Sequence, residues 1–523
     1  MSDENSSIYG PPTTEGSLAL AASATAVPEL TLISSPAPSP WWRIADLSVL
    51  GVWIAIVGFI LPYHEKWADE AQAWLIARDL PLSRIWFYEL RYEGSPGLWH
   101  TILWIAQHVF HAKYGALGYI GMAGATAGAA LLIFKAPFPR YIRWPLAFTY
   151  FMVYQYAVIA RPYTLLPLLA FAAAIFFKDL QHPERLTVVL VLLANLSLHG
   201  TILAGCLGLV YLIDAWRARD TLDAGARRRY WICIGVMAVV FVFIVMILKP
   251  TPDVGEFAKR KTLDEMPAVI KAMQPTKLMK LEATISGAFL DYWFPSAIFI
   301  LFTGWWSRRR QRLLLFALPM LLLTALYSLI HGYAHHHGTL FVATITALWV
   351  AWPTPHEERL FGVSERHIQH AMIAGLLVLC ALNMWDAEVA IHHEYLYPYS
   401  GAEDAAKYLK SVGADHQRIL GFLYGTVGIQ AYFDHNILVN MPAAYYHHGM
   451  PFHGLELDLD EFNRLDPDYV IVFTEQPHLS MEMGIPAVRA QGFDIVHMSD
   501  GYMIYKQGVY VRQFYFILRR VQP

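Results

Sequence analysis

Charge is scarce in this chain. Only 15% of its 523 residues are Asp, Glu, Lys or Arg, whereas 56% are hydrophobic. Soluble domains average about 25% charged residues, so the composition excludes an ordinary soluble protein and indicates a polytopic membrane protein. The net charge is −3, and no contiguous basic face occurs outside the loops between apolar runs. A nucleic-acid partner is therefore not expected.

Cysteine is also rare. The three cysteines, Cys206, Cys233 and Cys380, all lie in apolar runs, where a thiol is usually a small buried hydrophobe. No disulfide framework follows, and the region after Cys380 has no cysteine at all. The sequence also lacks a P-loop, a G-x-G-x-x-G after a predicted strand, and H-E-x-x-H. Nucleotide-driven transport and zincin chemistry therefore have no support.

Composition divides the chain into three regions. Residues 1–40 are rich in Ser, Pro, Ala and Thr and predict a disordered tail. Residues 41–390 contain the apolar runs and predict a transmembrane domain. Residues 391–523 have a soluble composition, in which an amphipathic segment at 402–412 and the run Tyr469–Thr474 (YVIVFT) predict a small α/β domain. The predicted fold class is all-α and polytopic, followed by an extracytoplasmic α/β domain.

The apolar runs predict about eleven transmembrane helices, each of about 15 to 20 residues. They cover roughly 44–61, 115–134, 144–160, 163–177, 185–199, 200–216, 230–248, 284–305, 312–331, 338–353 and 368–386. A cytoplasmic N-terminus puts the arginine-rich loops at Arg227–Arg229 and Arg308–Arg310 inside the cell, which is the positive-inside pattern. An odd number of spans then places the C-terminal domain outside the cytoplasmic membrane. The segment Pro96–Phe110 is predicted to lie along the interface.

Acidic residues gather in the loop after the first predicted span, between Pro62 and His100. Asp69 and Glu70 begin a helical pattern, and Glu93 precedes a Gly-Ser-Pro-Gly turn. Acids near a bilayer usually serve function or are paired. The pair could instead be a helix cap with an acid in the first turn, and Glu93 a solvated turn acid. We interpret all three as candidate catalytic residues, with Asp69 or Glu70 as a general base, a metal ligand, or both.

Basic and aromatic residues at the other outer mouths are the candidate substrate-binding residues. Arg161 lies between two apolar runs, where its guanidinium could hold a phosphate or snorkel to the interface. Tyr163 follows two residues later, and His100, His199 and His335 lie at other outer ends. The last of these belongs to a run of three histidines, which is poor geometry for a metal because neighbours on a helix point apart.

Four motifs follow one another on the predicted outer side. They are Asp-Glu in ADEAQAWLIARD, then Tyr-Glu-Gly-Ser-Pro-Gly-Leu-Trp-His, Ala-Arg-Pro-Tyr and Leu-Ser-Leu-His-Gly. Over roughly residues 44 to 350 this pattern resembles the GT-C membrane glycosyltransferases. Relatives are the protein O-mannosyltransferases, the lipid A aminoarabinose transferase and the rhizobial galacturonosyltransferases. The chain departs from many of them at Gly-Ser-Pro-Gly, where they have a His-Pro-Pro-like turn. It also has Arg161-Pro-Tyr where the mannosyltransferase-like branch has an acid.

The resemblance implies a glycosyltransferase that moves a sugar from a polyprenyl-phosphate carrier to an extracytoplasmic glycan, lipid or protein. It puts Asp69 and Glu70 at the family's first-loop acids, and Glu93 at the acid or histidine before the proline element. No cofactor is assigned, and a divalent cation on Asp69 and Glu70 is left open. One alternative is a transporter or flippase of lipid-linked sugars, which would carry its charges at the bilayer midplane. Another is a membrane-anchored binding protein that works through residues 395–523.

Overall fold

The computed structural model describes residues 40–249, 275–330, 332–352, 364–441, 459–475 and 484–521. The predicted tail at 1–40 lies outside these residues except for Pro40. The chain divides into two units, Met1–Leu47 and Ser48–Pro523. Of the first unit only the opening turns of helix α1 are described. The site described below belongs entirely to the second unit.

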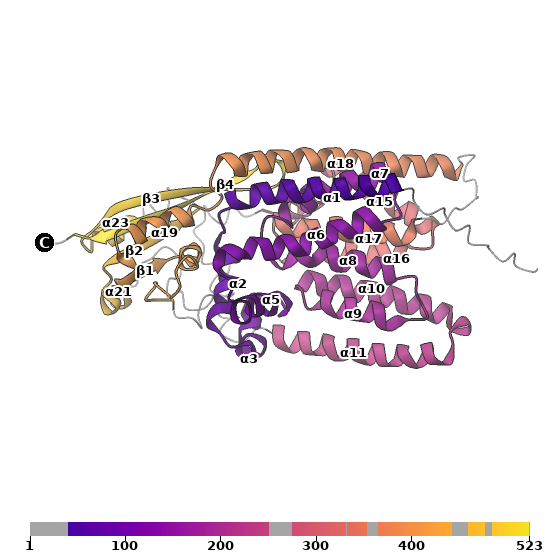
Figure 1. Ribbon diagram of the computed structural model, residues 1–523, viewed down its shortest axis with the longest axis horizontal. Coiled ribbons are helices and arrows are strands. Elements are labelled where there is room, and N and C mark those ends of the chain that lie inside the picture. Colours follow the sequence, from indigo (N-terminus) through magenta and orange to yellow (C-terminus); the bar gives the residue numbers. More distant parts are fainter. Residues whose placement is uncertain are drawn as a thin grey trace, which may run out of the picture. The chain divides into compact units, whose positions relative to one another are not determined.

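Helices make up most of the described chain (Figure 1). They are α1 (Pro40–Ile60), α2 (Ala68–Asp79), α3 (Leu82–Arg84), α4 (Leu90–Glu93), α5 (Leu98–His108), α6 (Leu117–Lys135), α7 (Arg140–Ala147), α8 (Leu166–Phe176), α9 (Pro183–Ala194), α10 (Leu198–Arg217), α11 (Ala224–Leu248), α14 (Lys277–Ala288), α15 (Trp293–Arg309), α16 (Leu313–Ala325), α17 (His337–Ala351), α18 (Glu365–Leu396), α19 (Ala402–Ser411), α20 (Val427–Gln430), α21 (Leu459–Leu465) and α23 (Ile485–Arg489).

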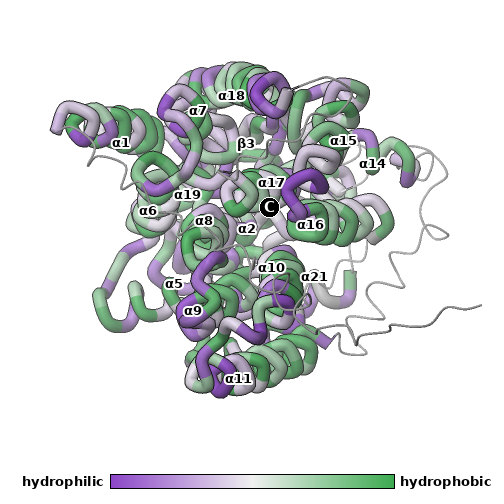
Figure 2. Tube along the Cα trace, turned by 90° about the vertical axis from the view of Figure 1, so that its right-hand side faces the viewer, coloured by the Kyte–Doolittle hydropathy of each residue, from purple (hydrophilic) through white to green (hydrophobic). Residues whose placement is uncertain are grey.

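Several of these helices are long and apolar enough to cross a membrane. Within the described ranges five qualify alone, namely those containing α1, α6, α10, α11 and α18, and the bent pair α14–α15 makes a sixth. Helix α11 exposes Trp231, Val239 and Val245 by 68% or more, as a helix facing lipid does. By contrast, all of α17 is buried, and it lies in the middle of the helices (Figure 2). The polytopic helical fold is therefore confirmed, while the count of about eleven spans stays a prediction, since the remaining helices are short for a bilayer.

The predicted span at 144–160 is wrong as a continuous helix. Helix α7 ends at Ala147, and a wide turn at Phe151–Gln155 and irregular backbone follow it. Pro145 lies inside α7, where it removes a backbone donor and crowds the preceding turn. The irregular backbone leaves the Ala160 N–H free to donate to a side chain, and it donates to Glu70 Oε1 at 2.8 Å.

The predicted span at 284–305 is also interrupted. Helices α14 and α15 meet at an angle of 69°. Helix α14 ends at Ala288, and Asp291, between the two helices, has φ of 65°, a left-handed conformation that redirects the chain. Helix α5, which covers the predicted interfacial segment, has only 11 residues and is too short to span a bilayer.

The C-terminal region holds a four-stranded sheet in the order β1-β2-β4-β3 (Figure 1). Its strands are β1 (Ile419–Phe422), β2 (Tyr469–Thr474), β3 (Phe493–Ile504) and β4 (Tyr510–Arg520). β1 and β2 are parallel, and the other neighbours are antiparallel. The predicted strand and amphipathic helix are confirmed as β2 and α19.

The sequence Ser-Asp-Gly at residues 499–501 is typical of a hairpin turn and predicts one between two strands, which is wrong: β3 continues through it, and the chain turns at Lys506–Gly508. Gly501 instead allows close packing: a Cβ there would lie 2.2 Å from the Ser400 carbonyl carbon.

The β3–β4 turn anchors the sheet to the helices. Lys506 is 7% exposed, and its Nζ lies 2.5 Å from Asp291 Oδ1 and 3.4 Å from Asp386 Oδ2. The backbone N–H of Gln507 donates to Asp386 Oδ1 at 3.2 Å. A buried ammonium needs such carboxylate partners. Helix α18 runs without a break across the predicted domain boundary at 390–391, so the sheet is joined to the helices both covalently and through this turn.

Candidate active site

A cavity of about 310 Å³ opens beside the first turn of α2. Its lining comes from α2, the α4–α5 turn, the backbone before α8, the start of α10, the segment before α17, and Tyr424 of the C-terminal domain. Six of the predicted site residues line it: Asp69, Glu93, His100, Arg161, Tyr163 and His199. Segments that are far apart in sequence therefore bring these side chains to one place, while the predicted residues Glu70 and His335 do not line the cavity.

The start of α2 gives the two adjacent acids different surroundings. The N-cap is Trp67, and Glu70 at the third helical position reaches back to it, its Oε2 accepting the Trp67 N–H at 3.3 Å. Asp69 is one residue earlier and points into the cavity. Neither acid is the N-cap, but both lie in the first turn, where the helix dipole favours a carboxylate, so this part of the alternative interpretation holds.

Asp69 is held by one cation and one hydroxyl. Its Oδ2 lies 2.9 Å from Arg161 Nη2, and its Oδ1 accepts a hydrogen bond from the Tyr424 hydroxyl at 3.0 Å. Arg161 Nη1 lies 2.9 Å from His335 Nε2, so the guanidinium bridges Asp69 and His335. The side chains of Asp69 and Arg161 are 24% and 19% exposed, which leaves both within reach of a ligand in the cavity.

Glu93 also lines the cavity. Its Oε1 accepts a hydrogen bond from Gln72 Nε2 at 2.5 Å. Gln72 is three residues after Asp69 on α2, and residues at that spacing share one helix face. His100 Nε2 lies 3.6 Å from Glu93 Oε2, too far for a hydrogen bond, although His100 is only 1% exposed. A buried imidazole without a hydrogen bond in the described chain is suited to binding a polar ligand.

Aromatic and imidazole rings form another side of the cavity. Tyr163 and His199 share a hydrogen bond between the Tyr163 hydroxyl and His199 Nδ1 at 2.9 Å. His199 lies in the first turn of α10, behind the N-cap Ser197, whose Oγ accepts the Gly200 N–H. The ring of His336 lies 4.4 Å from that of His199 and also lines the cavity. Of the histidine run, His336 lines the cavity, whereas His335 contacts Arg161 outside the lining.

Glu70 lies away from the cavity in a buried charged cluster. It is fully buried, and its Oε2 lies 2.9 Å from His64 Nε2, while His64 Nδ1 lies 2.6 Å from Glu394 Oε1 on α18. Tyr154 donates its hydroxyl hydrogen to the other Glu394 oxygen. Burial alone would lower the pKa of His64, but Glu70 and Glu394 outweigh it and raise this pKa to about 10. Burial would raise the pKa of Glu70, yet protonated His64 holds that pKa below its ordinary value.

Sequence reasoning missed four residues of this region. Tyr424 comes from the C-terminal domain, directly after Leu423, whose φ of 71° is strained for a branched side chain. Gln72 and His336 line the cavity, and His64 organises the buried cluster. His336 had a signal in the histidine run. Tyr424 had none, because a single tyrosine after a short strand does not indicate which surface that strand will face.

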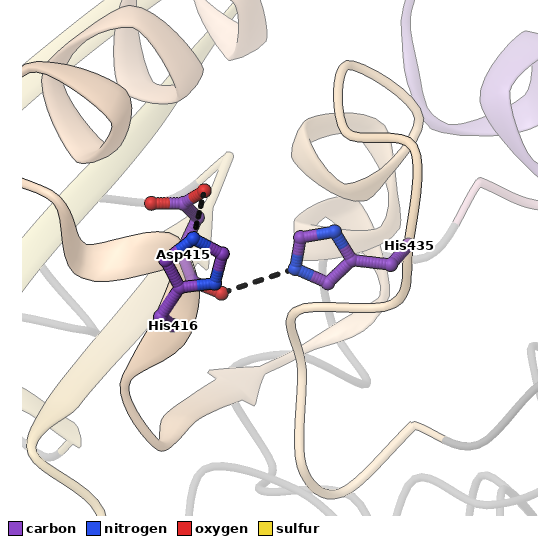
Figure 3. Close-up of side chains that lie close together, drawn as sticks. All are labelled: Asp415, His416 and His435. Carbon is purple, nitrogen blue, oxygen red and sulfur yellow. Dashed lines mark hydrogen bonds and ion pairs between the residues drawn. The ribbon is translucent and has the colours of Figure 1, made fainter.

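Asp69 and Glu70 do not suit one shared metal ion. Asp69 already faces the guanidinium of Arg161, and Glu70 is buried against His64. In the parts of the chain that the structure describes, a group of three ligand-type side chains close enough to share an ion occurs elsewhere, at Asp415, His416 and His435 (Figure 3).

The helical fold and this cavity define a polytopic membrane protein with an acid- and arginine-lined site next to a small α/β domain. No protein-family model matches the chain, and no curated protein matches it. Among solved structures, the crystal structure of ArnT from Cupriavidus metallidurans in the apo state is similar, with a TM-score of 0.51 and 13% identity. The match covers 92% of this chain and 98% of that chain. The chain therefore has the same fold as this ArnT structure.

Proposed function

We propose that this protein is an integral membrane glycosyltransferase that moves a sugar from a polyprenyl-phosphate carrier to an extracytoplasmic glycan, lipid or protein. The observation that carries this proposal is the pairing of Asp69 with Arg161 at the edge of a cavity in a chain with the ArnT fold. Such a pair offers a base and a phosphate-binding cation within one site. A flippase would need its charges within the spans at midplane, whereas these lie at helix ends.

In the proposed reaction the acceptor hydroxyl attacks the anomeric carbon of the donor sugar while its proton passes to Asp69. The new bond joins the acceptor oxygen to that carbon, and the bond from the carbon to the phosphate oxygen breaks. The electron pair leaves with the polyprenyl phosphate, whose growing charge Arg161 stabilises. Because Arg161 is paired with Asp69 before substrate binds, an incoming phosphate draws the guanidinium away and frees the carboxylate to accept the proton.

The remaining lining residues have binding roles in this proposal. Glu93 and His100 bind hydroxyl groups of the sugar, since one offers carboxylate oxygens and the other an imidazole without a hydrogen bond. Tyr163 and His199 form the wall on the side of Arg161, and His335 fixes the guanidinium from behind. Tyr424 makes the C-terminal domain part of the site, which argues against a separate binding module at residues 395–523.

Arg161→Lys tests the phosphate-binding role. The guanidinium contacts Asp69 and His335 through two different nitrogens, and a single ammonium cannot make both contacts and also grip a phosphate. We expect transfer to fall by about 10²-fold, a typical effect of losing one preorganised donor to a developing charge. The measurement is the initial rate with a polyprenyl-phosphate sugar donor at matched protein level. Arg84→Lys, at an exposed arginine of the loop between Pro62 and His100, is the control. Unchanged turnover in Arg161→Lys would return this residue to an interfacial role.

We also propose that the protein lies in the cytoplasmic membrane with its N-terminus inside and the C-terminal domain outside. Arg228 and Ser411 are both exposed, and the three native cysteines are buried, so single cysteines at these two positions can report on sidedness. A membrane-impermeant maleimide applied to intact spheroplasts should label Ser411→Cys and leave Arg228→Cys unlabelled until the cells are lysed. Labelling of Arg228→Cys in intact spheroplasts would contradict this topology.

A further inference from the structure

A second cluster of ligand-type side chains lies in the C-terminal domain, apart from the cavity. It consists of Asp415, His416 and His435, whose ligand atoms all lie within 4.8 Å of one another. Figure 3 shows the two imidazole rings near Asp415, with the carbonyl oxygen of Asp415 between them. The rings are nearly parallel, with an interplanar angle of 7° and centroids 5.9 Å apart.

The backbone brings these residues together from two segments. Gly413 has φ of 65°, and it turns the chain after α19 into the short 3₁₀ turn η9 (Ala414–His416). Further on, Ile419 forms a parallel bridge with Leu438, and the Val439 N–H donates to the Ile419 carbonyl at 2.9 Å. His435 is three residues before Leu438, and His416 is three before Ile419. A parallel register therefore sets the two histidines side by side.

The distances suit a transition-metal ion after a small side-chain movement. A triangle with sides of 4.8 Å has its centre about 2.8 Å from each corner, and Zn²⁺ bonds to nitrogen and oxygen are about 2.0 to 2.2 Å. Each ligand atom would therefore move by less than about 1 Å. The His416 side chain is 81% exposed and has room to turn, whereas the Asp415 side chain is 23% exposed.

We propose that Asp415, His416 and His435 bind one Zn²⁺ ion, with water in the remaining position. Two imidazoles and a carboxylate are ligands that zinc commonly takes, whereas Mg²⁺ and Ca²⁺ need mainly oxygen ligands. His435 Nε2 lies 3.1 Å from the Asp415 carbonyl oxygen, and a bound ion would replace that hydrogen bond with a metal bond to the same nitrogen. This site does not rest on the proposed transferase function.

The ion would link η9 to the segment around His435, which contacts α2. On one side, Arg78 of α2 donates to the Phe433 carbonyl at 2.7 Å and to Asn436 Oδ1 at 2.6 Å, so its guanidinium grips the loop on both sides of His435. On the other side, Lys410 Nζ donates to the Tyr432 carbonyl at 2.6 Å. Helix α2 carries Asp69 in its first turn. Zinc therefore joins η9 to the loop that rests on α2, and it stabilises the contact between the C-terminal domain and that helix.

The test uses the full chain without a histidine tag, purified in detergent and freed of metal with a chelator. Titration with Zn²⁺ should show one bound ion per chain in the wild type and none in a His416→Ala,His435→Ala double variant. Each single variant should bind Zn²⁺ at least about tenfold more weakly, because each loses one ligand. Zn²⁺ should also raise the unfolding temperature of the wild type but not of the double variant, and Mg²⁺ should do neither. His108→Gln, an exposed histidine elsewhere, is the control and should bind as the wild type does.

The outcomes separate the proposal from weak binding at scattered histidines. Because His416 is exposed, His416→Ala should unfold at the wild-type temperature in the absence of metal, so a loss of zinc binding cannot be assigned to misfolding. Equal zinc stoichiometry in the wild type and the double variant would overturn the site, as would binding that His108→Gln weakens as much as His416→Ala. The readout is metal binding, so a failure of the transferase proposal leaves this result unaffected.

Discussion

Asp69→Asn is expected to lower sugar transfer by about 10²-fold or more while the protein still folds and inserts. The amide keeps the size of the side chain and can still contact Arg161 and Tyr424, but it cannot take a proton from the acceptor hydroxyl. Because the N-cap of α2 is Trp67, the substitution removes no capping interaction. The measurement is the initial rate of transfer from a polyprenyl-phosphate sugar in liposomes, at matched protein level and thermal stability.

Two further variants make this result specific. Asp79→Asn, at the other end of α2, removes a carboxylate that pairs with Arg78 outside the cavity and should transfer at the wild-type rate. Glu70→Gln should reduce the amount of folded protein more than the turnover of what remains, because Glu70 is buried against His64. Near-wild-type turnover in Asp69→Asn would show that the base is a different group.

His64→Gln is expected to destabilise the fold by about 3 to 5 kcal/mol, the usual cost of removing one partner from a buried ion pair. Glutamine has no positive charge, so Glu70 and Glu394 would remain buried without their shared cation. These contacts join the loop between Pro62 and His100 to α18. Loss of the His64 contacts should therefore destabilise the first turn of α2. The measurement is the free energy of unfolding in detergent, compared with His108→Gln as an exposed control.

The free energy of unfolding of the wild type, compared with that of His64→Gln, should also depend on pH. The pKa of His64 is about 10 in the folded protein, above its ordinary value of 6.5. The stabilisation from protonated His64 is therefore complete below about pH 6.5 and is lost as the pH rises through 10. The wild type should lose stability between about pH 6.5 and pH 10, and the difference in the free energy of unfolding between the wild type and His64→Gln should become smaller. A constant difference from pH 6 to pH 10 would show that His64 does not act through its charge.

Hydrophobic runs and short motifs predicted much of the fold. The apolar segments predicted α6, α10, α11 and α18 because a helix in lipid must satisfy its own backbone and shows this as an uninterrupted apolar run. The same rule failed at 144–160, where buried irregular backbone is satisfied by side chains such as Glu70. Residues buried in the protein interior are apolar because they pack against other side chains. Hydropathy alone therefore does not distinguish such a segment from a transmembrane span.

The sequence predicted most of the residues that meet at the cavity, with Glu70 and His335 as the exceptions. Asp69, Glu93 and Arg161 could be chosen because acids and arginines are rare at these positions in an apolar chain. Whether Asp69 or Glu70 faces the cavity depends on the orientation of the first turn of α2. Two neighbouring acids in the sequence do not determine this orientation. Tyr424 depends on how a distant domain docks, and that is decided by long-range contacts such as those of Lys506.

The most direct test of the proposed function follows both products of one reaction. The purified protein is reconstituted in liposomes with a polyprenyl-phosphate sugar labelled in the sugar and with envelope extract as acceptor. We predict that labelled sugar appears on the acceptor, that polyprenyl phosphate is released in equal amount, and that both processes stop in Asp69→Asn. Movement of the intact lipid-linked sugar across the bilayer without release of polyprenyl phosphate, unchanged in Asp69→Asn, would contradict the account and favour a flippase.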